Sequence, residues 1–239
     1  MGNRKRSMEK MSKIDLLYED NHILIAVKPP NMLTQGDQTG DRDMLAALKE
    51  DLKIRHNKPG NVFLGMVHRL DRPVGGVMVF AKTSKAASRL SEQIRNRQFD
   101  KTYLAVVHGV PEKTFGTLEH YLAKNEKANY VNIVDPLHNK NGEAKRAVLD
   151  YTLRASSAGI SLVNIKLHTG RPHQIRVQMA AIGNPLYGDQ KYGSGLNKPG
   201  MQLALWSSEI GFEHPTLKER MSFKSTPPSI YPWSEFVVI

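Results

Sequence analysis

Short apolar runs, each ended by turn-forming residues, restrict the fold of this 239-residue chain more than any other feature. The run from Ile23 to Val27 stops at Pro29-Pro30-Asn31, where Asn31 tolerates the positive φ of a turn. Residues 161–168 alternate between two faces, which is typical of a half-buried strand. Further strands are predicted over residues 62–67, 77–81, 101–107 and 202–206. The chain is therefore predicted to be rich in strands.

Helical periodicity appears in only three segments. One helix is predicted over residues 43–52, a second begins at Ser84, which can cap it, and a third opens at Thr169-Gly170-Arg171-Pro172. The side chains predicted to face the core from these helices are Met44, Leu45, Leu48, Leu52, Ala87, Leu90, Ile94, Ile175, Met179 and Ile182. Because helices are few and no βαβ unit recurs, the predicted fold class is α+β. We expect a mixed, mostly antiparallel central sheet flanked by helices and loops, with a cleft across the sheet.

The length suits one large domain or two small ones, and no repeat or long linker divides the chain. Residues 1–13 are predicted to form a frayed or disordered terminus, and residues 14–239 a single domain. The polar and basic stretch 112–148 is predicted to form hairpins and exposed loops. The N-terminus lacks the apolar core of a secretory signal, and no apolar run approaches the ~20 residues that cross a bilayer, so no membrane partner is expected.

The charge balance indicates a polyanionic partner. Lysine and arginine number 34 against 23 aspartates and glutamates, giving a net charge of +11. Such an excess raises the local concentration of nucleic acids and speeds their encounter. The alternative is a basic protein without a polyanionic partner. The positive residues are spread through the chain, so any surface for nucleic acid belongs to the fold itself.

The absence of cysteine excludes disulfides, a thiolate nucleophile, iron–sulfur clusters and cysteine-ligated zinc. It fits a reducing compartment, and a cytoplasmic location is expected. His68, His168 and His173 form neither an HxH nor an HExxH pattern, so no metal site is predicted. The chain has no P-loop and no GxGxxG after a strand, which leaves nucleotide hydrolysis and dinucleotide redox chemistry without support.

HRLDR, at residues 68–72, is the first candidate for chemistry. Asp71 stands among cationic residues that favour its ionised form, and Gly75-Gly76 follow, where another backbone can approach closely. An anion in such a turn is a candidate nucleophile. The alternative is a structural ion pair between Asp71 and an arginine at a strand end.

TGRPHQIR, at residues 169–176, supplies Arg171, His173 and Arg176 in the first turns of the predicted helix. A helix N-terminus attracts anions, and the Arg176 guanidinium adds a fork that can hold a carboxylate. These residues are alternatively solvated basic side chains.

Tyr103, in KTYLA, is either a core tyrosine of a strand or a platform for stacking a nucleic-acid base.

Together these segments resemble the RluA-type pseudouridine synthases, over residues 15–215. The matching segments are KPPN at 28–31, HRLDR at 68–72, FDKTYLAVVHG at 99–109, TGRPHQIRVQMAAIGNPLYGD at 169–189, and the HP pair at 214–215. HRLDR and TGRPHQIR in this order, about a hundred residues apart, make the resemblance specific. It implies a catalytic domain that isomerises specific uridines of ribosomal or transfer RNA, without cofactor or metal.

The resemblance also assigns roles residue by residue. Asp71 matches the nucleophile, Tyr103 the tyrosine that stacks on the base and helps proton transfer, and Arg176 the basic residue that pairs with the aspartate. The positions that match or suit substrate binding are Arg69, which would fill the gap left by an extruded base, Ile175, which would wall the base pocket, and Arg72, Arg171 and His173. Whether Asp71 attacks the ribose C1′ or the uracil C6 stays open, as does the acceptor of the C5 proton.

The chain departs from the family pattern in a few places. Val74-Gly75-Gly76 replace a common Ser-Gly or Thr-Ser-Gly, Asn31 replaces a common glycine, and Gln178 stands where histidine is frequent.

No S4-type RNA-binding domain is seen before the first motif, so RNA recognition is expected to rest on the catalytic domain, its loops or a partner. A monomer is expected. The alternative functions are a non-catalytic RNA-binding protein with the same fold that acts in ribosome assembly, and a structural basic protein.

Overall fold

The computed structural model describes residues 14–135, 137 and 144–236, so the predicted frayed terminus, residues 1–13, lies outside the described residues. The described elements are β1 (Asp15–Glu19), β2 (Ile23–Lys28), α2 (Met44–Arg55), β3 (Gly65–Met66), β4 (Gly75–Ala81), α3 (Ser84–Arg95), β5 (Asp100–His108), β6 (Phe115–Asn125), β7 (Tyr130–Val134), β8 (Lys145–Ser157), β9 (Ile160–Leu167), α4 (Gln174–Ala181), β10 (Leu205–Glu213), β11 (Arg220–Lys224) and a 3-10 turn, η2 (Trp233–Glu235).

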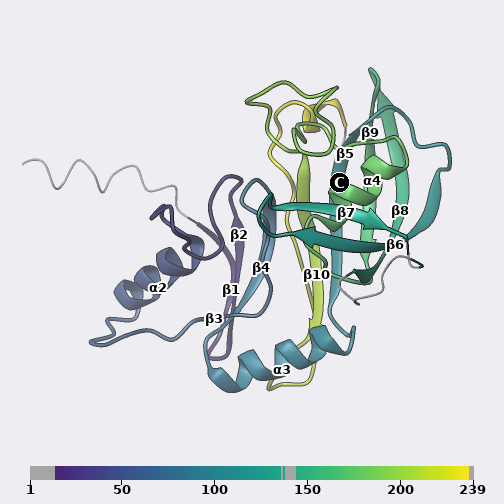
Figure 1. Cartoon of the computed structure of the whole chain (residues 1–239). Coiled ribbons are helices and arrows are strands. Elements are labelled where there is room, and N and C mark those ends of the chain that lie inside the picture. Colours follow the sequence, from purple (N-terminus) through teal and green to yellow (C-terminus); the bar gives the residue numbers. More distant parts are fainter. Residues whose placement is uncertain (1–13, 136, 138–143, 237–239) are drawn as a thin grey trace, which may run out of the picture.

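These strands form one 11-stranded sheet in the order β1-β2-β4-β10-β5-β9-β8-β6-β7, with β3 paired to β4 and β11 paired to β10. Each described pair of strands is antiparallel except β4 with β10. The predicted α+β fold with a mixed, mostly antiparallel sheet is therefore confirmed. The polar stretch after β5 forms the predicted hairpin, β6–β7, which crosses over α4 (Figure 1).

Two glycines allow the parallel pair to form. Gly75 lies opposite Trp206 and Gly76 opposite Ser207. A Cβ on Gly75 would lie 2.3 Å from the Trp206 ring, and one on Gly76 would lie 2.3 Å from the Ser207 carbonyl oxygen. Gly76 also has φ +120°, which side chains rarely adopt. The Gly75-Gly76 pair that follows Asp71 therefore lets β10 approach the start of β4.

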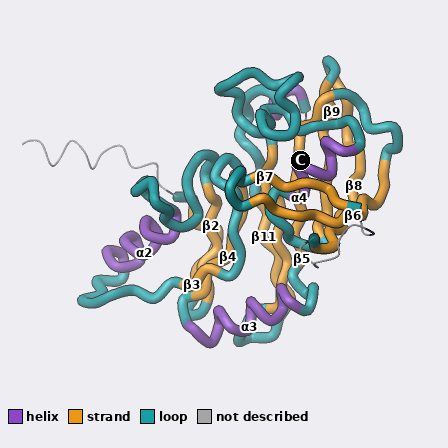
Figure 2. The backbone as a smooth tube through the Cα atoms, viewed as in Figure 1, coloured by secondary structure: helices purple, strands orange, loops and turns teal. Residues whose placement is uncertain are grey.

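The continuous apolar run of β2 reflects burial on both faces of the sheet. Leu24 and Ala26 pack in a core shared with α2 and α4. Ile23 and Ile25 point the other way, into a second core beneath α3. Figure 2 shows the few helices placed separately against this sheet. β2 and β4 thus lie in the interior and form a rigid base for the loops at their ends.

The third helix starts later than the sequence predicts. α4 begins at Gln174, because His173 adopts the left-handed conformation, with φ 50°, and cannot continue a helix. The Gln174 side chain accepts hydrogen bonds from Thr169 Oγ1 at 2.8 Å and from the Arg171 amide at 3.0 Å. Arg171 and His173 consequently lie in a turn before the helix, and only Arg176 lies within it.

Several predicted boundaries also change. The strand expected over residues 62–67 shortens to β3, because β10 occupies the same edge of β4 from Gly75 onward. The cap of α3 is Thr83 rather than Ser84, since the Thr83 side chain accepts the Ala86 amide. β9 is buried on both faces only near its start, where Trp233 and Phe236 cover Leu162, whereas Lys166 near its end is exposed, as predicted for a half-buried strand. The strand predicted over 202–206 begins three residues later, as β10.

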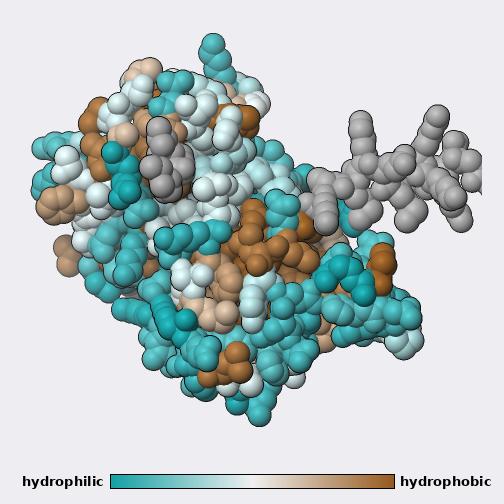
Figure 3. Space-filling model, turned by 180° about the vertical axis from the view of Figure 1, so that it is seen from behind, coloured by the Kyte–Doolittle hydropathy of each residue, from teal (hydrophilic) through white to brown (hydrophobic). Residues whose placement is uncertain are grey.

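The face opposite to that of Figure 1 is largely hydrophilic, with apolar side chains gathered near its centre (Figure 3). Large exposed apolar side chains occur along the described chain from Leu17 to Tyr231. Among the residues that the structure describes, no helix is both long and apolar enough to span a bilayer.

Candidate active site

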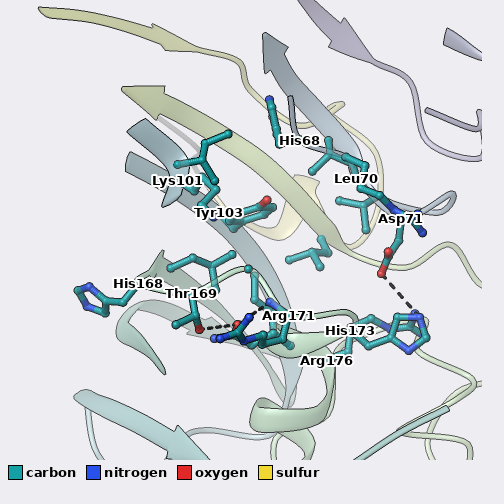
Figure 4. A pocket seen from close by; sticks show the side chains of 18 of the residues that line it. His68, Leu70, Asp71, Lys101, Tyr103, His168, Thr169, Arg171, His173 and Arg176 are labelled. Atoms are coloured by element: carbon teal, nitrogen blue, oxygen red, sulfur yellow. Dashed lines mark hydrogen bonds and ion pairs between the residues drawn. The ribbon is translucent and has the colours of Figure 1, made fainter. Parts of the chain in front are cut away.

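A pocket of about 540 Å³ lies where the β3–β4 loop, β5 and the start of α4 meet. A volume of this size suits a small-molecule or nucleotide ligand. The predicted site residues that line it are Asp71, Tyr103, Arg176, Arg69, Ile175, Arg171 and His173 (Figure 4). Segments a hundred residues apart in the sequence thus contribute to one cavity. Arg72 is the predicted site residue that does not line it.

Asp71 begins a tight turn, residues 71–74, in which the Val74 amide donates to the Asp71 carbonyl at 2.9 Å. Two buried side chains hold this turn. Lys28 Nζ donates to the carbonyls of Arg72 at 3.0 Å and Val74 at 2.7 Å. On the other side, Thr34 Oγ1 donates to the Leu70 carbonyl at 2.8 Å. The backbone on both sides of the Asp71 carboxylate is therefore fixed, while the carboxylate itself stays 28% exposed to the pocket.

Lys28 is fully buried, and its own pKa reflects this. Burial lowers the pKa of the ammonium to about 7, with the Asp71 carboxylate opposing the shift and Arg72 adding to it. Between that value and the ordinary pKa of 10.5, the unfolded chain binds a proton that the native state has released. Stability should therefore rise with pH across this window, by up to about 1.4 kcal/mol per pH unit from this group.

Replacing Lys28 with methionine is expected to lower the free energy of unfolding at neutral pH by at least about 2 kcal/mol, because the carbonyls around Nζ lose their donor. The variant should also lose the rise in stability between pH 7 and about 9.5. Urea unfolding at several pH values measures both effects. Lys53→Met, at an exposed position of α2, is the matched control. Parallel stability curves for wild type and Lys28→Met would contradict the proposed titration of Lys28.

The two arginines of HRLDR differ in their surroundings. Arg72 is exposed, forms an ion pair with Asp41 at 2.8 Å, and donates to the Asn31 carbonyl at 3.3 Å. Asn31 has φ 66°, so the predicted positive-φ turn is confirmed. Arg69 is exposed at the edge of the pocket. Of the two, Arg69 is the one placed to meet a molecule that enters the cavity.

Arg176 has a different direct partner from the one expected. Instead of binding Asp71, its guanidinium makes two hydrogen bonds to Asp189, at 2.7 and 2.8 Å, and both side chains are buried. Burial opposes the charge on Arg176, but the hydrogen bonds and charge of Asp189, with a further contribution from Asp71, raise its pKa. Asp189 is eight residues beyond the end of α4, and its partner could not be read from the sequence. Arg176 and Asp71 still line the same pocket.

His173 is the nearest cation-forming group to the Asp71 carboxylate, with Nε2 3.9 Å from Oδ2. Its Nδ1 lies 2.7 Å from the hydroxyl of Tyr192, which accepts the Val131 amide at 2.9 Å. Burial lowers the pKa of His173, an effect that Asp71 opposes, so the ring is neutral at pH 7. The Tyr192 hydroxyl can donate to Nδ1 or accept from it, and the first arrangement leaves the ring proton on Nε2, which faces Asp71.

The other two histidines of the sequence motifs have structural partners. His68 Nε2 accepts the Val79 amide at 3.1 Å, and burial together with the Lys101 charge lowers its pKa to about 3. His168 Nε2 lies 2.6 Å from Asp150 Oδ2. Among the described residues, no group of three or more histidine, aspartate or glutamate side chains is arranged to hold a metal ion.

Tyr103 lies on β5, buried at 7% exposure, with its ring on the wall of the pocket. Burial raises the pKa of the phenol, the Asp71 carboxylate adds to the shift, and Ser207 works against it. The phenol is therefore neutral at physiological pH and keeps a proton that it can donate. Figure 4 shows Tyr103 on one side of the pocket and Asp71 at its edge, directed towards His173.

The sequence interpretation did not assign Lys28, Thr34, Asp189 and Tyr192 to the site. Lys28 and Asp189 stand within the matched segments KPPN and TGRPHQIRVQMAAIGNPLYGD. Their place in these segments could have marked them as candidate site residues. Thr34 and Tyr192 carry no such signal, because each contacts a residue at least 19 positions away.

A model of the family described as RNA pseudouridylate synthase matches residues 22–181. The chain belongs to this family of isomerases, which confirms the family resemblance and the enzyme class inferred from the motifs. It is 33% identical to an uncharacterized RNA pseudouridine synthase of Aquifex aeolicus (strain VF5), covering 93% of this chain and 73% of that protein. It is also 33% identical to the ribosomal large subunit pseudouridine synthase C of Buchnera aphidicola subsp. Baizongia pistaciae, covering 86% of this chain and 64% of that protein.

The fold has counterparts among solved structures. Human RNA Pseudouridylate Synthase Domain Containing 4 superposes with a TM-score of 0.74 at 23% identity, over 89% of this chain and 88% of that chain. Human RNA Pseudouridylate Synthase Domain Containing 1 gives a TM-score of 0.69 at 24% identity, over 92% of this chain and 85% of that chain. These similarities establish the fold.

Proposed function

We propose that the chain isomerises specific uridines in RNA to pseudouridine, with the Asp71 carboxylate as nucleophile and without a cofactor. The observation that carries the proposal is the convergence of Asp71, Tyr103 and Arg176 on one pocket of about 540 Å³. A fixed turn supports the carboxylate, and an exposed fraction of it faces the space that a base would occupy. Preorganisation of this kind favours covalent catalysis.

In the proposed reaction Asp71 attacks the ribose C1′ or the uracil C6. The C1′–N1 bond breaks, the uracil rotates, a new bond joins C1′ to C5, and the bond to the Asp71 carboxylate breaks again. The proton of C5 then leaves and N1 takes a proton, so no atom is gained or lost overall. Tyr103, held neutral by burial, stacks on the ring and donates a hydrogen bond to it, whereas water is the better candidate to accept the C5 proton.

Two side chains, the cationic Arg176 and the neutral His173, are proposed to act on Asp71. Arg176, locked by Asp189, supplies a fixed positive charge that stabilises the ionised carboxylate. His173 directs its Nε2 proton towards Oδ2 and orients the carboxylate. Ile175, buried and next to Arg176 in the pocket lining, is proposed to form the apolar wall of the base site.

The target nucleotide must leave its stack to reach Asp71, at a cost of a few kcal/mol. The net charge of +11 supplies phosphate contacts that offset this cost. Arg69, exposed at the pocket edge, is proposed to fill the gap left by the extruded base, and Arg72 to contact the RNA outside the pocket. The name of the Buchnera relative favours ribosomal RNA as the substrate.

Chemical mapping of pseudouridine in cellular RNA, with and without the gene, tests this function. We expect one or a few uridines to lose the modification in cells without the gene and to regain it on complementation. The competing proposal, a non-catalytic RNA-binding protein in ribosome assembly, predicts the same pseudouridine map in both strains. Unchanged maps across all cellular RNA would therefore exclude the isomerase.

Two substitutions at Tyr103 separate stacking from proton chemistry. Tyr103→Phe keeps the ring and removes the hydroxyl, so its rate is expected to fall by about 10²-fold, the scale of one acid–base contribution. Tyr103→Ala loses the stacking platform as well and should fall by at least a further tenfold. Single-turnover rates on a mapped RNA substrate measure both. Near-wild-type rates for both variants would show that Tyr103 has no part in the reaction.

A further inference from the structure

A second cavity, of about 390 Å³, adjoins the proposed uridine pocket. The two cavities share part of their lining, including Lys101, Arg97, His168 and Thr169, so they form one continuous cleft. The second cavity carries no role in the proposed reaction. Its lining is rich in cations, since Lys101, Arg97, Arg146 and Lys166 all contribute.

The acidic side chains in the second cavity are already paired. Asp100 forms an ion pair with Arg220. Asp150 accepts a hydrogen bond from Thr117 at 2.7 Å and lies 2.6 Å from His168 Nε2. Arg146 is also paired, through two hydrogen bonds to Glu119, and the Lys166 charge acts on Asp150, whereas Lys101 and Arg97 have no acidic partner among the described residues.

Lys101 is the cation at the junction of the two cavities. It lies on β5 two residues before Tyr103, so both side chains point from the same face of the strand into the cleft (Figure 4). Lys101 is half-buried, yet within the described part of the chain it makes no hydrogen bond and no ion pair. Burial and the nearby charge of Arg171 both lower its pKa. An unpartnered ammonium in such surroundings is expected to bind an anion.

The backbone beside Lys101 leaves room for this charge. Its Nζ lies 3.0 Å from the position that a Cβ would take on Gly170, so any larger residue there would press on the ammonium. Arg171 follows directly. Its Nε donates to the Arg146 carbonyl at 3.0 Å, and the guanidinium has no acidic partner among the described residues. Lys101, Gly170 and Arg171 thus line the same pocket as the ring of Tyr103, and the Arg171 charge is close enough to act on Lys101.

We propose that Lys101 and Arg171 bind the phosphodiester group next to the target uridine and so hold the extruded nucleotide with its base on Tyr103. This deepens the proposed function and rests on it. Two residues along a strand place Lys101 about 7 Å from Tyr103, a distance that one nucleotide can span. A phosphate can accept hydrogen bonds from two cations at once, and both of these line the same pocket.

Ligand-observed NMR with three probes tests the subsite: uridine, uridine 3′-monophosphate and uridine 5′-monophosphate. The wild type is expected to bind at least one monophosphate about tenfold or more tightly than uridine, the scale of one charge-assisted hydrogen bond. Lys101→Met should abolish this preference and leave the affinity for uridine unchanged. Lys53→Met, the same substitution at an exposed position of α2, should keep the preference.

Folding of the variant is checked by its thermal midpoint. Removing an unpartnered half-buried charge should leave the midpoint unchanged or raise it, whereas loss of a structural lysine would lower it. Lys101→Gln, which keeps a polar stem, provides a second neutral variant. Equal affinity of the wild type for all three probes, or a preference that survives in both Lys101 variants, would overturn the subsite.

The same variants separate this inference from the proposed isomerase. Should wild-type protein convert uridine in RNA but show no preference for the monophosphates, the subsite fails and the isomerase stands. Should the preference depend on Lys101 while no RNA is ever converted, the isomerase fails and the anion site stands. If both hold, Lys101→Met is expected to raise the KM for RNA at least tenfold, with a smaller effect on kcat.

Discussion

Replacing Asp71 with asparagine is expected to lower the rate of uridine isomerisation at least about 10³-fold, because it removes the proposed nucleophile while keeping the shape of the side chain. RNA affinity should persist, since the arginines and lysines of the cleft remain. The carboxylate makes no hydrogen bond among the described residues, and the nearest basic side chain is that of His173, 3.9 Å away and neutral at pH 7. The free energy of unfolding should therefore change by less than about 1 kcal/mol.

The experiment combines single-turnover conversion of a mapped RNA, binding of the same RNA and urea unfolding. Asp51→Asn, at the half-exposed aspartate paired with Arg55 on α2, is the matched control and should leave all three unchanged. If Asp71 were instead a structural ion pair, Asp71→Asn would lower stability by several kcal/mol. A variant that still converts RNA at the wild-type rate would remove Asp71 from the role of nucleophile.

Asp189→Asn is expected to cause the largest loss of stability, about 3–5 kcal/mol, because it leaves the buried Arg176 guanidinium without its carboxylate. Asp189 also accepts the backbone amides of Lys191 and Tyr192, at 3.0 and 3.1 Å, so the turn that carries Tyr192 should loosen as well. For a chain of this size the thermal midpoint should fall by roughly 10 °C.

A double variant separates the structural role of Arg176 from its chemical role. Arg176→Met with Asp189→Leu replaces the buried pair by apolar side chains of similar volume, which is often neutral or stabilising. We expect it to unfold at a midpoint close to that of the wild type and yet to convert RNA at least about 10²-fold more slowly, because no fixed cation then acts on Asp71. Conversion at the wild-type rate would leave Arg176 a purely structural role.

The strands that could be predicted are those whose own residues form a clear apolar run in the sequence. β2, β4, β5 and β9 are apolar because they lie inside the sheet, and their runs mark them in the sequence. β1, β6, β7 and β11 lie at or near edges and carry more exposed side chains, so their pattern is weaker and their bounds were not predicted. The partner of each strand depends on contacts between distant segments, which periodicity does not report.

The site likewise combines features that the local sequence predicts with features that depend on contacts between distant segments. HRLDR and TGRPHQIR mark Asp71 and Arg176 as candidates, since the residue types themselves suit the proposed chemistry. The pairing of Arg176 with Asp189 was missed, because it depends on how the chain returns after α4. The left-handed turn at His173 was also missed, since a proline at position 172 suggested a helix that had already begun. Arg72 was assigned to the substrate by its place in the motif. Its guanidinium pairs with Asp41 outside the pocket, and its contact with RNA stays a prediction.

The position of β10 between β4 and β5 has a consequence for synthesis of the protein. This central strand is made last among the interior strands, and Gln202, just before it, donates to the Pro73 carbonyl in the Asp71 turn at 2.7 Å. An emerging chain therefore cannot complete the middle of its sheet until about residue 213 has left the ribosome. Such late, long-range closure slows folding and leaves the edges of β4 and β5 exposed to chaperones and to aggregation in the meantime.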